Sequence, residues 1–217
     1  MKKSTFDGRP ELLEQEGAVM RINFDVESVM EPVPSMDGGE QGEREVFKAY
    51  VVRVPLPFSV DSVKAALMAE GFDEYKSEAV ACEAVFVSGG SSDIDMAKQM
   101  VIARISAYDT SDAVNGFYLN GREMWIPREL RNELTERIAR EEARGHDTVP
   151  FDYNGQEITL PINDDVKAML EQLKYYADDC YTQTQRHKAA VTAKRSVNTV
   201  LNYDYTTGYP TKPTFNI

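Results

Sequence analysis

The chain has 217 residues, of which 42% are hydrophobic and 28% charged, as in a globular protein with one or two domains. Its net charge of −12 argues against nucleic acid as a partner, because phosphate backbones repel an acidic surface and no lysine or arginine cluster offsets it. No apolar run approaches about 18 residues, so we expect no membrane span. The polar residues that follow Lys2 and Lys3 are unlike a secretory signal.

We expect residues 1–45 to form an extended N-terminal arm. Residues 1–16 are polar, with at most one helical turn at residues 10–13. Apolar and polar residues alternate within residues 18–29, which predicts a half-buried strand. The prolines, glycines and acidic residues of positions 31–45 indicate a loop or linker.

Residues 46–106 are predicted to form a second segment, one strand followed by helices. The strand covers residues 46–54 and ends at Pro55. The first helix covers residues 59–70, with Ser59 or Ser62 as its N-cap and Gly71 after its end. Helices are also predicted at residues 77–87, where 85–87 could equally be a strand, and at residues 93–106.

Residues 107–217 are predicted to form a C-terminal domain. Asn-Gly turns at 120–121 and 154–155 predict two β-hairpins, and between them Pro127 and Gly145 bound a helix at 128–144. Asn163 then caps a long amphipathic helix, and Ser196 caps a short one. The expected class is therefore α+β: a small antiparallel sheet of hairpins packed with helices, one long C-terminal helix, and a separate N-terminal strand and helix region.

No pattern predicts a catalytic residue, a metal ligand or a cofactor site. Cys82 and Cys180 are more typical of buried small hydrophobes than of a disulfide. His187 lies on the apolar stripe of the long helix, which favours a hydrogen-bonded packing role. Asp178 and Asp179 diverge by about 100° around a helix, which favours a solvated face over a shared-proton pair.

Three other features have simple structural interpretations. Asp93 suits an N-cap better than a calcium loop, because the glycine and terminal glutamate of such a loop are missing. Trp125, the single tryptophan, is expected to anchor the first hairpin to the helices. Tyr175, Tyr176 and Tyr181 are more typical of core or interface aromatics than of a ligand platform.

The second half of the chain carries a family resemblance. The residues that carry it fall in a fixed order: Ala107-Tyr108-Asp109, Phe117 to Gly121, Met124-Trp125-Ile126, Arg131, Gly145, Leu173, Tyr176-Ala177, Cys180-Tyr181, Thr184, His187 and Tyr203 to Pro210. This pattern is similar to an uncharacterised C-terminal domain of tail-associated and tail-fibre-associated proteins of phages and prophages, especially those of gut bacteria. It covers about residues 107–217. Residues 48–52 and the helix after them resemble the companion region of such proteins only loosely.

The resemblance implies a phage virion structural protein: a tail, connector or fibre-associated subunit that is not an enzyme and is assembled in the bacterial cytoplasm. Its expected partners are other phage structural proteins and further copies of itself, without nucleic acid, membrane or cofactor. The aromatic residues expected to contact partners are Tyr175, Tyr181, Tyr205, Tyr209 and Phe215.

Two alternatives stay open. The first is a tail-fibre assembly chaperone that is absent from the finished particle. The second is a small carbohydrate- or peptidoglycan-processing enzyme of the tail, which would need two carboxylates about 5–10 Å apart in a cleft.

Overall fold

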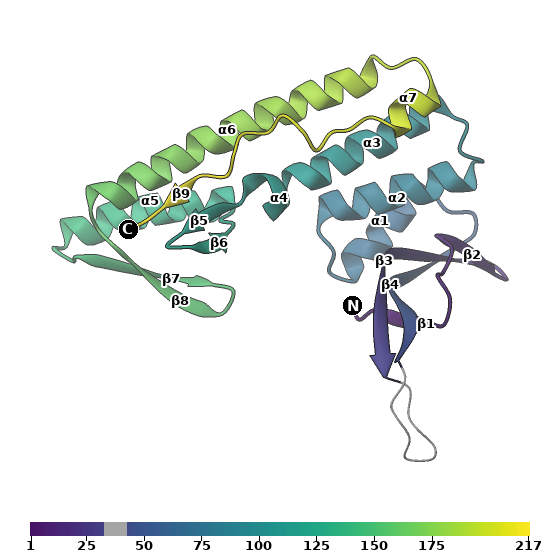
Figure 1. The fold of residues 1–217 in the computed structure, drawn as a ribbon, viewed down its shortest axis with the longest axis horizontal. Helices are drawn as coiled ribbons and strands as arrows, with labels where there is room; N and C mark the ends of the chain where they lie inside the picture. The colour runs from purple at the N-terminus through teal and green to yellow at the C-terminus, as the bar shows by residue number, and fades with distance from the viewer. Residues whose placement is uncertain (33–42) are drawn as a thin grey trace. The chain divides into compact units, whose positions relative to one another are not determined.

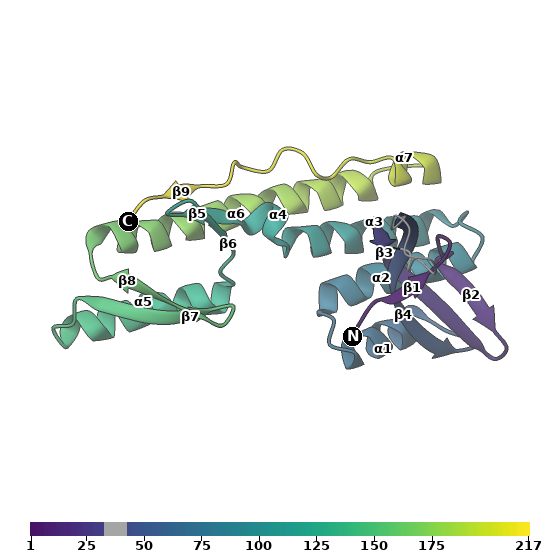
Figure 2. The same ribbon diagram turned by 60° about the horizontal axis from the view of Figure 1, so that its bottom comes forward.

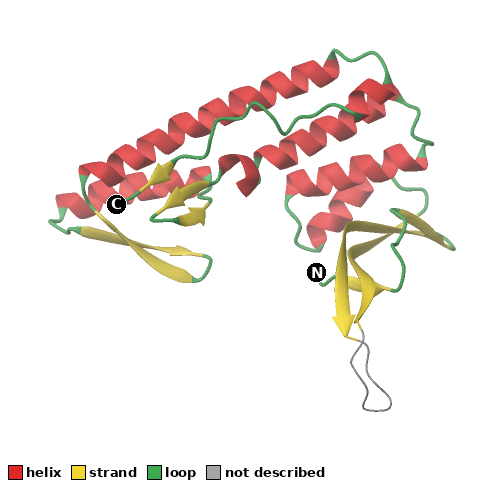
Figure 3. Cartoon of the chain, viewed as in Figure 1, coloured by secondary structure: helices red, strands yellow, loops and turns green. Residues whose placement is uncertain are grey.

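The computed structural model describes residues 1–32 and 43–217, and it confirms the α+β class (Figures 1 and 3). The chain forms two compact units, which are described separately below. Unit 1 consists of Met1–Ala107 and Val191–Tyr203, and unit 2 of Tyr108–Ala190 and Asp204–Ile217. Each unit therefore combines a long segment before position 191 with a short segment after position 190. The three consecutive segments expected from the sequence do not show this arrangement.

Unit 1 contains a four-stranded antiparallel sheet with the strand order β1-β4-β3-β2. Its strands are β1 (Ser4–Phe6), β2 (Leu13–Glu16), β3 (Val19–Pro32) and β4 (Glu43–Pro55). The two long strands β3 and β4 pair along most of their length, with a bulge between Phe24 and Glu27. Asp25 in this bulge has a φ of 52°, a conformation that aspartate tolerates better than most residues.

The structure corrects the expected N-terminal arm in two places. Residues 4–6 and 13–16 are strands, where a helical turn at residues 10–13 was the most that the sequence indicated. Their pairing partners lie in β4 and β3, and such non-local pairing leaves no local sequence pattern. Of the loop expected at residues 31–45, both ends extend β3 and β4, and residues 33–42 lie outside the described part.

Helices α1 (Val60–Ala69) and α2 (Glu74–Ser88) pack on this sheet (Figure 2). The core between them includes Ile22 and Val54 of the sheet, Val63 and Leu67 of α1, and Ala81 of α2. Unit 1 also holds most of α3 (Ile94–Asp109) and the short helix α7 (Val197–Leu201).

Several helix boundaries follow their predicted caps. Ser59 caps α1 and Ser196 caps α7, as expected, and Asp93 accepts hydrogen bonds from the first backbone N–H groups of α3. By contrast, α2 begins at Glu74 instead of residue 77, because Asp73 accepts from the Lys76 N–H and caps it. Residues 85–87 are helical, so the strand alternative there is wrong.

Unit 2 contains the two expected hairpins. Strands β5 (Phe117–Leu119) and β6 (Arg122–Met124) form the first, and β7 (Thr148–Tyr153) and β8 (Gln156–Pro161) the second. Asn120 and Asn154 have φ values of 50° and 54°, and the glycine after each also has positive φ, as a type I′ turn requires.

The helices of unit 2 also follow the sequence closely. They are α4 (Asp112–Asn115), α5 (Arg128–Ala143) and α6 (Asp164–Thr192), the last of which is the predicted long helix. The Asn163 side chain accepts from the Val166 N–H, which confirms it as a cap. Only α4, a single turn, was not expected.

The last strand of the chain was not predicted at all. Strand β9 (Thr214–Phe215) lies parallel to β5 and completes a three-stranded sheet with the order β6-β5-β9. The Phe215 ring joins the core of unit 2, 6.1 Å from the ring of Phe117. That core also includes Met124, Leu134 and Leu173. In the part of the chain that the structure describes, no helix combines the length and apolar character needed to span a bilayer.

Candidate functional site

A group of hydrogen-bonded side chains in unit 2 lies where the C-terminal tail contacts α6. Helix α6 presents Thr184 and His187 to this place, the end of α3 presents Asp109, and the tail presents Thr207 and Tyr209. We call these five residues the tail cluster. The two residues from α6 lie three apart on the same face of the helix as the buried Tyr176 and Cys180.

The tail cluster contains two hydrogen-bonded groups, which a ring contact between His187 and Tyr209 joins. The Thr184 hydroxyl donates to Asp109 Oδ1 over 2.9 Å and lies 3.0 Å from the Tyr209 hydroxyl oxygen. Nε2 of His187 lies 2.9 Å from the carbonyl oxygen of Thr207 and 3.0 Å from the side-chain nitrogen of Gln183. The His187 ring also packs against that of Tyr209, with centroids 5.4 Å apart.

The tail bends sharply beside this network. Gly208 has a φ of +78°, and a Cβ there would lie 2.6 Å from the side-chain nitrogen of Gln183. The positive φ favours glycine here, whereas the flexible Gln183 side chain could move away from a Cβ. On the other side, the Tyr108 ring makes edge contacts with the rings of Tyr205 and Tyr209.

Burial decides the ionisation of the groups around the tail cluster. It raises the pKa of Asp109, an effect that the hydrogen bond from Thr184 partly opposes. It also raises the pKa of Tyr209 and brings the pKa of the Cys180 thiol to about 11. The Tyr176 hydroxyl donates to the carbonyl of Val114, and Cys180 Sγ lies 3.8 Å from the same oxygen.

The tail cluster does not have the arrangement of a nucleophilic relay. Such a relay needs the base to accept a hydrogen bond from the nucleophile. Here Thr184 is bonded to Asp109 and Tyr209, while His187 is bonded to the tail backbone. The Cys180 thiol is buried and protonated at neutral pH, so it does not supply a nucleophile either. The cluster holds the tail of its own chain in place.

Beyond the tail cluster, contacts with Glu123 and Asn120 fix the rest of the tail. Lys212 Nζ lies 2.5 Å from Glu123 Oε1. The Asn120 side chain donates from Nδ2 to the Ile217 carbonyl and accepts through Oδ1 from the Ile217 N–H, each over 2.9 Å. The Asn120 N–H donates to the carbonyl of Phe215 over 2.8 Å. The hairpin turn at Asn120 is thus also a docking point for residues 97 positions later.

The five aromatic residues predicted to contact partners fall into two groups. Tyr175 and Tyr181 are 63% and 59% exposed on α6. Tyr205 and Tyr209 are half-buried against Tyr108, and Phe215 is buried in the core, so its ring is used within the chain. The packing role predicted for His187 is confirmed, and Asp178 and Asp179 are exposed as expected. Cys82 and Cys180 are free and buried, so the preferred interpretation of both is confirmed.

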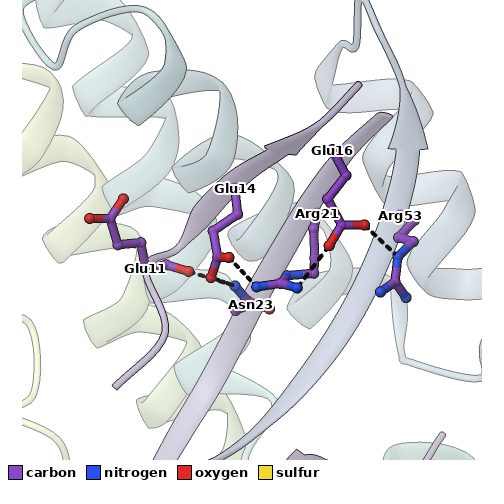
Figure 4. Close-up of polar contacts among 6 residues, drawn as sticks. All are labelled: Glu11, Glu14, Glu16, Arg21, Asn23 and Arg53. Carbon is purple, nitrogen blue, oxygen red and sulfur yellow. Dashed lines mark hydrogen bonds and ion pairs between the residues drawn. The ribbon is translucent and has the colours of Figure 1, made fainter. Parts of the chain in front are cut away.

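A second polar network lies on the sheet of unit 1 (Figure 4). Arg21 of β3 lies directly opposite Glu14 of edge strand β2 and opposite Arg53 of β4. Glu16 accepts from Arg21 over 2.7 Å and from Arg53 over 3.0 Å, which offsets the repulsion between the two arginines. Asn23 extends the network by donating to the Glu11 carbonyl and to Glu14. The network fixes the register of the short edge strand.

Unit 2 also contains two surface hollows. A groove of about 280 Å³ lies between α5 and α6, and its two carboxylates, Glu142 and Glu171, are each paired with a lysine. A larger hollow of about 400 Å³, which we call the Trp125 pocket, is lined by residues of three segments: Thr110, Ser111, Asp112, Glu123, Met124, Trp125, Tyr153 and Asn154. Among the described residues, no group of three or more His, Cys, Asp or Glu side chains is arranged to hold a metal ion.

No protein-family model, curated protein or solved structure matches this chain. Sequence reasoning placed His187 on the apolar stripe of the long helix and Asn120 in a hairpin turn. It predicted neither the hydrogen bond between Thr184 and Asp109 nor the docking of the tail on Asn120. The prediction of a hairpin anchor for Trp125 also missed the pocket, because its walls come from segments up to about 40 residues apart.

Proposed function

We propose that this chain is a structural subunit of a phage virion, in the tail, a connector or a fibre, and that it works by binding other proteins. The observation that carries this proposal is the exposed face of α6. Asp178 lies three residues from both Tyr175 and Tyr181, so it is next to each tyrosine on the helix surface, and the two tyrosines lie about 120° apart around the helix. All three are exposed, and the two tyrosines are among the most exposed large apolar side chains of the described residues. We call these three residues the tyrosine face.

Exposed tyrosines are enriched at protein interfaces, where they bury a large ring and keep a polar end for hydrogen bonding. Asp178, with Asp179 next to it, makes this face acidic. Charge complementarity therefore favours a partner surface that is partly apolar and basic. A second copy of the same face would bring acidic residues together, so the expected self-association would use another surface.

The family resemblance supports the virion assignment through a different set of residues. Tyr176, Cys180, Thr184 and His187 belong both to the resembling pattern and to the buried side of α6 that holds the tail. On this proposal the buried side is the framework of the domain, and the opposite side is where partners bind.

Mass spectrometry of purified particles tests the virion assignment. Particles would be purified from a phage or induced prophage that encodes the chain. A constant number of copies per particle is the expected result. Presence in assembly intermediates but absence from finished particles would replace the proposal with the assembly chaperone. Absence from both would refute any role in the virion.

The tyrosine face is tested with the double variant Tyr175→Ala and Tyr181→Ala. Truncation of one residue at an interface centre costs about 2 kcal/mol, which is about 30-fold in affinity, so the double variant should weaken incorporation into particles by at least that factor. The matched control is Tyr75→Ala on α2, since Tyr75 is also exposed, at 46%. Equal incorporation of both variants, with unchanged circular dichroism, would show that the tyrosine face is not the binding surface.

A further inference from the structure

The Trp125 pocket has the size of a small-molecule site. Its volume of about 400 Å³ lies within the range of about 300–1,000 Å³ that is typical of ligand pockets. It is formed by the connection between α3 and α4, by strand β6, and by the turn between β7 and β8, all within unit 2. The function proposed above makes no use of it.

The aromatic wall of the pocket is held in a fixed arrangement. The backbone N–H of Trp125 donates to the hydroxyl oxygen of Tyr153 over 3.0 Å, which ties strand β6 to the second hairpin. The guanidinium of Arg122 lies over the Tyr153 ring, 5.2 Å from its centroid. One face of Tyr153 is thus already covered by a cation of the chain. Trp125 is half-exposed and supplies aromatic surface for a ligand.

Charges of both signs surround the pocket. Asp112 and Glu123 are its two carboxylates. Lys212 Nζ lies 2.5 Å from Glu123 Oε1, and the Asp112 carboxylate also attracts the Lys212 ammonium. The guanidinium of Arg122 over Tyr153 is a second cation of the chain beside the pocket, so ions of both signs are already present there. A cationic or an anionic ligand would therefore gain little net attraction, which favours a neutral one.

The rim offers groups that bind hydroxyls. Asp112 and Glu123 supply carboxylate oxygens as acceptors, and the Asn154 amide supplies both a donor and an acceptor. The Ser111 hydroxyl donates to the Tyr108 carbonyl over 2.7 Å, and the Ser111 oxygen can still accept a hydrogen bond. Asp152 Oδ1 accepts from the Gly155 N–H, which holds the turn that presents Asn154.

From this combination we infer that the Trp125 pocket binds a neutral saccharide ring. A sugar ring has one face of C–H groups, which packs on the indole of Trp125, and a rim of hydroxyls, which bond to Asp112, Glu123 and Asn154. The inference is for binding and not for hydrolysis, since one of the two carboxylates is held in an ion pair with Lys212. It does not depend on the virion assignment.

The single tryptophan makes the test direct. Excitation beyond the tyrosine absorption band reports on Trp125 alone, because the chain has no other tryptophan. The probes are glucose, galactose, mannose, N-acetylglucosamine, lactose and maltose, with sorbitol as an open-chain polyol, glucosamine as a cation and galacturonate as an anion. At least one neutral ring sugar should change the emission saturably, with a Kd of about 1 mM or tighter. Sorbitol and the two charged sugars should bind at least about tenfold more weakly than it does.

Three variants locate the binding. Asp112→Asn removes one carboxylate, and Asn154→Gly removes the amide but keeps the positive φ of the turn. Each should weaken binding about tenfold. Asp165→Asn, which removes an exposed carboxylate from the first turn of α6, is the matched control and should bind as the unchanged protein does. For Trp125→Phe, isothermal titration calorimetry replaces fluorescence and should detect weaker binding.

The inference is overturned if no neutral ring sugar gives a saturable change. It is also overturned if the charged sugars or sorbitol bind equally well, or if the pocket variants bind like the control. Thermal unfolding of each variant shows whether it still folds. A variant that does not fold is replaced by Glu123→Gln, with the same expected loss of affinity.

Discussion

Replacing Thr184 with valine removes the centre of the tail cluster. The Thr184 side chain is fully buried, and its Oγ1 is within hydrogen-bonding distance of both Asp109 and Tyr209. Valine fills nearly the same space without the hydroxyl. A hydrogen bond to a charged group contributes about 1.5–3 kcal/mol, so we expect unit 2 to lose about 2 kcal/mol of stability.

For a unit of about 100 residues, 1 kcal/mol lowers the Tm by about 4–8 °C, so Thr184→Val should lower it by about 8–16 °C. Trp125 lies in unit 2, so thermal unfolding followed by its fluorescence reports on this unit specifically. Thr182→Val is the matched control, because Thr182 lies on the exposed side of the same helix. A shift for Thr184→Val no larger than that of the control would show that the cluster does not stabilise the fold.

A double-mutant cycle with Tyr209→Phe separates the two bonds of Thr184. If the hydroxyls of Thr184 and Tyr209 interact directly, the double variant should lose less stability than the two single variants together, by about 0.5 kcal/mol or more. Strict additivity would mean that their 3.0 Å approach contributes no energy.

Three further predictions concern ionisable groups. The raised pKa of Asp109 means that its ionisation opposes folding, so the free energy of unfolding should fall as pH rises from 3.8 through the folded pKa. Urea unfolding measured across this pH range should show the fall for the unchanged protein and not for Asp109→Asn. The pKa of Glu14 is lowered, mainly by its hydrogen bond from Arg21. Ionised Glu14 therefore stabilises the fold above pH 4.5, and this stabilisation is lost as pH falls through the folded pKa. Glu14→Gln should therefore lower the free energy of opening of β2 at neutral pH by less than about 1 kcal/mol, because the pair with Arg21 is partly exposed. Faster amide exchange in β2 would show this loss at neutral pH, and no change is expected in acid. With thiol pKa values of about 11 and both side chains buried, Cys82 and Cys180 should react with Ellman's reagent only after unfolding, and rapid labelling of the native protein would contradict their burial.

The sequence predicted the features that depend on neighbouring residues. The two Asn-Gly turns define their hairpins within about ten residues each, and the long stripe of α6 has an N-cap at Asn163. These patterns depend only on residues close in sequence, so they can be recognised without knowing the fold. The buried positions of His187 and Cys180 followed from the same stripe.

What the sequence did not predict depends on contacts between distant segments. Strand β9 is two residues long and exists because β5 and the Asn120 side chain bind it. Phe215 was expected to face a partner, since an aromatic residue near the end of a turn-rich tail has no periodic pattern that predicts burial. The Trp125 pocket combines residues from three segments, and no spacing rule connects them.

The way the two units share the chain limits how the protein can be divided. Unit 1 needs Val191–Tyr203, which begins at the end of α6, and unit 2 needs Asp204–Ile217, which follows it. No single cut therefore yields two fragments that each hold one whole unit. During synthesis, neither unit has all its residues until the chain has been made past α6, and unit 2 waits for residue 217. A premature stop between α6 and residue 215 would remove Phe215 from the core of unit 2, so such products are expected to be substrates for proteolysis.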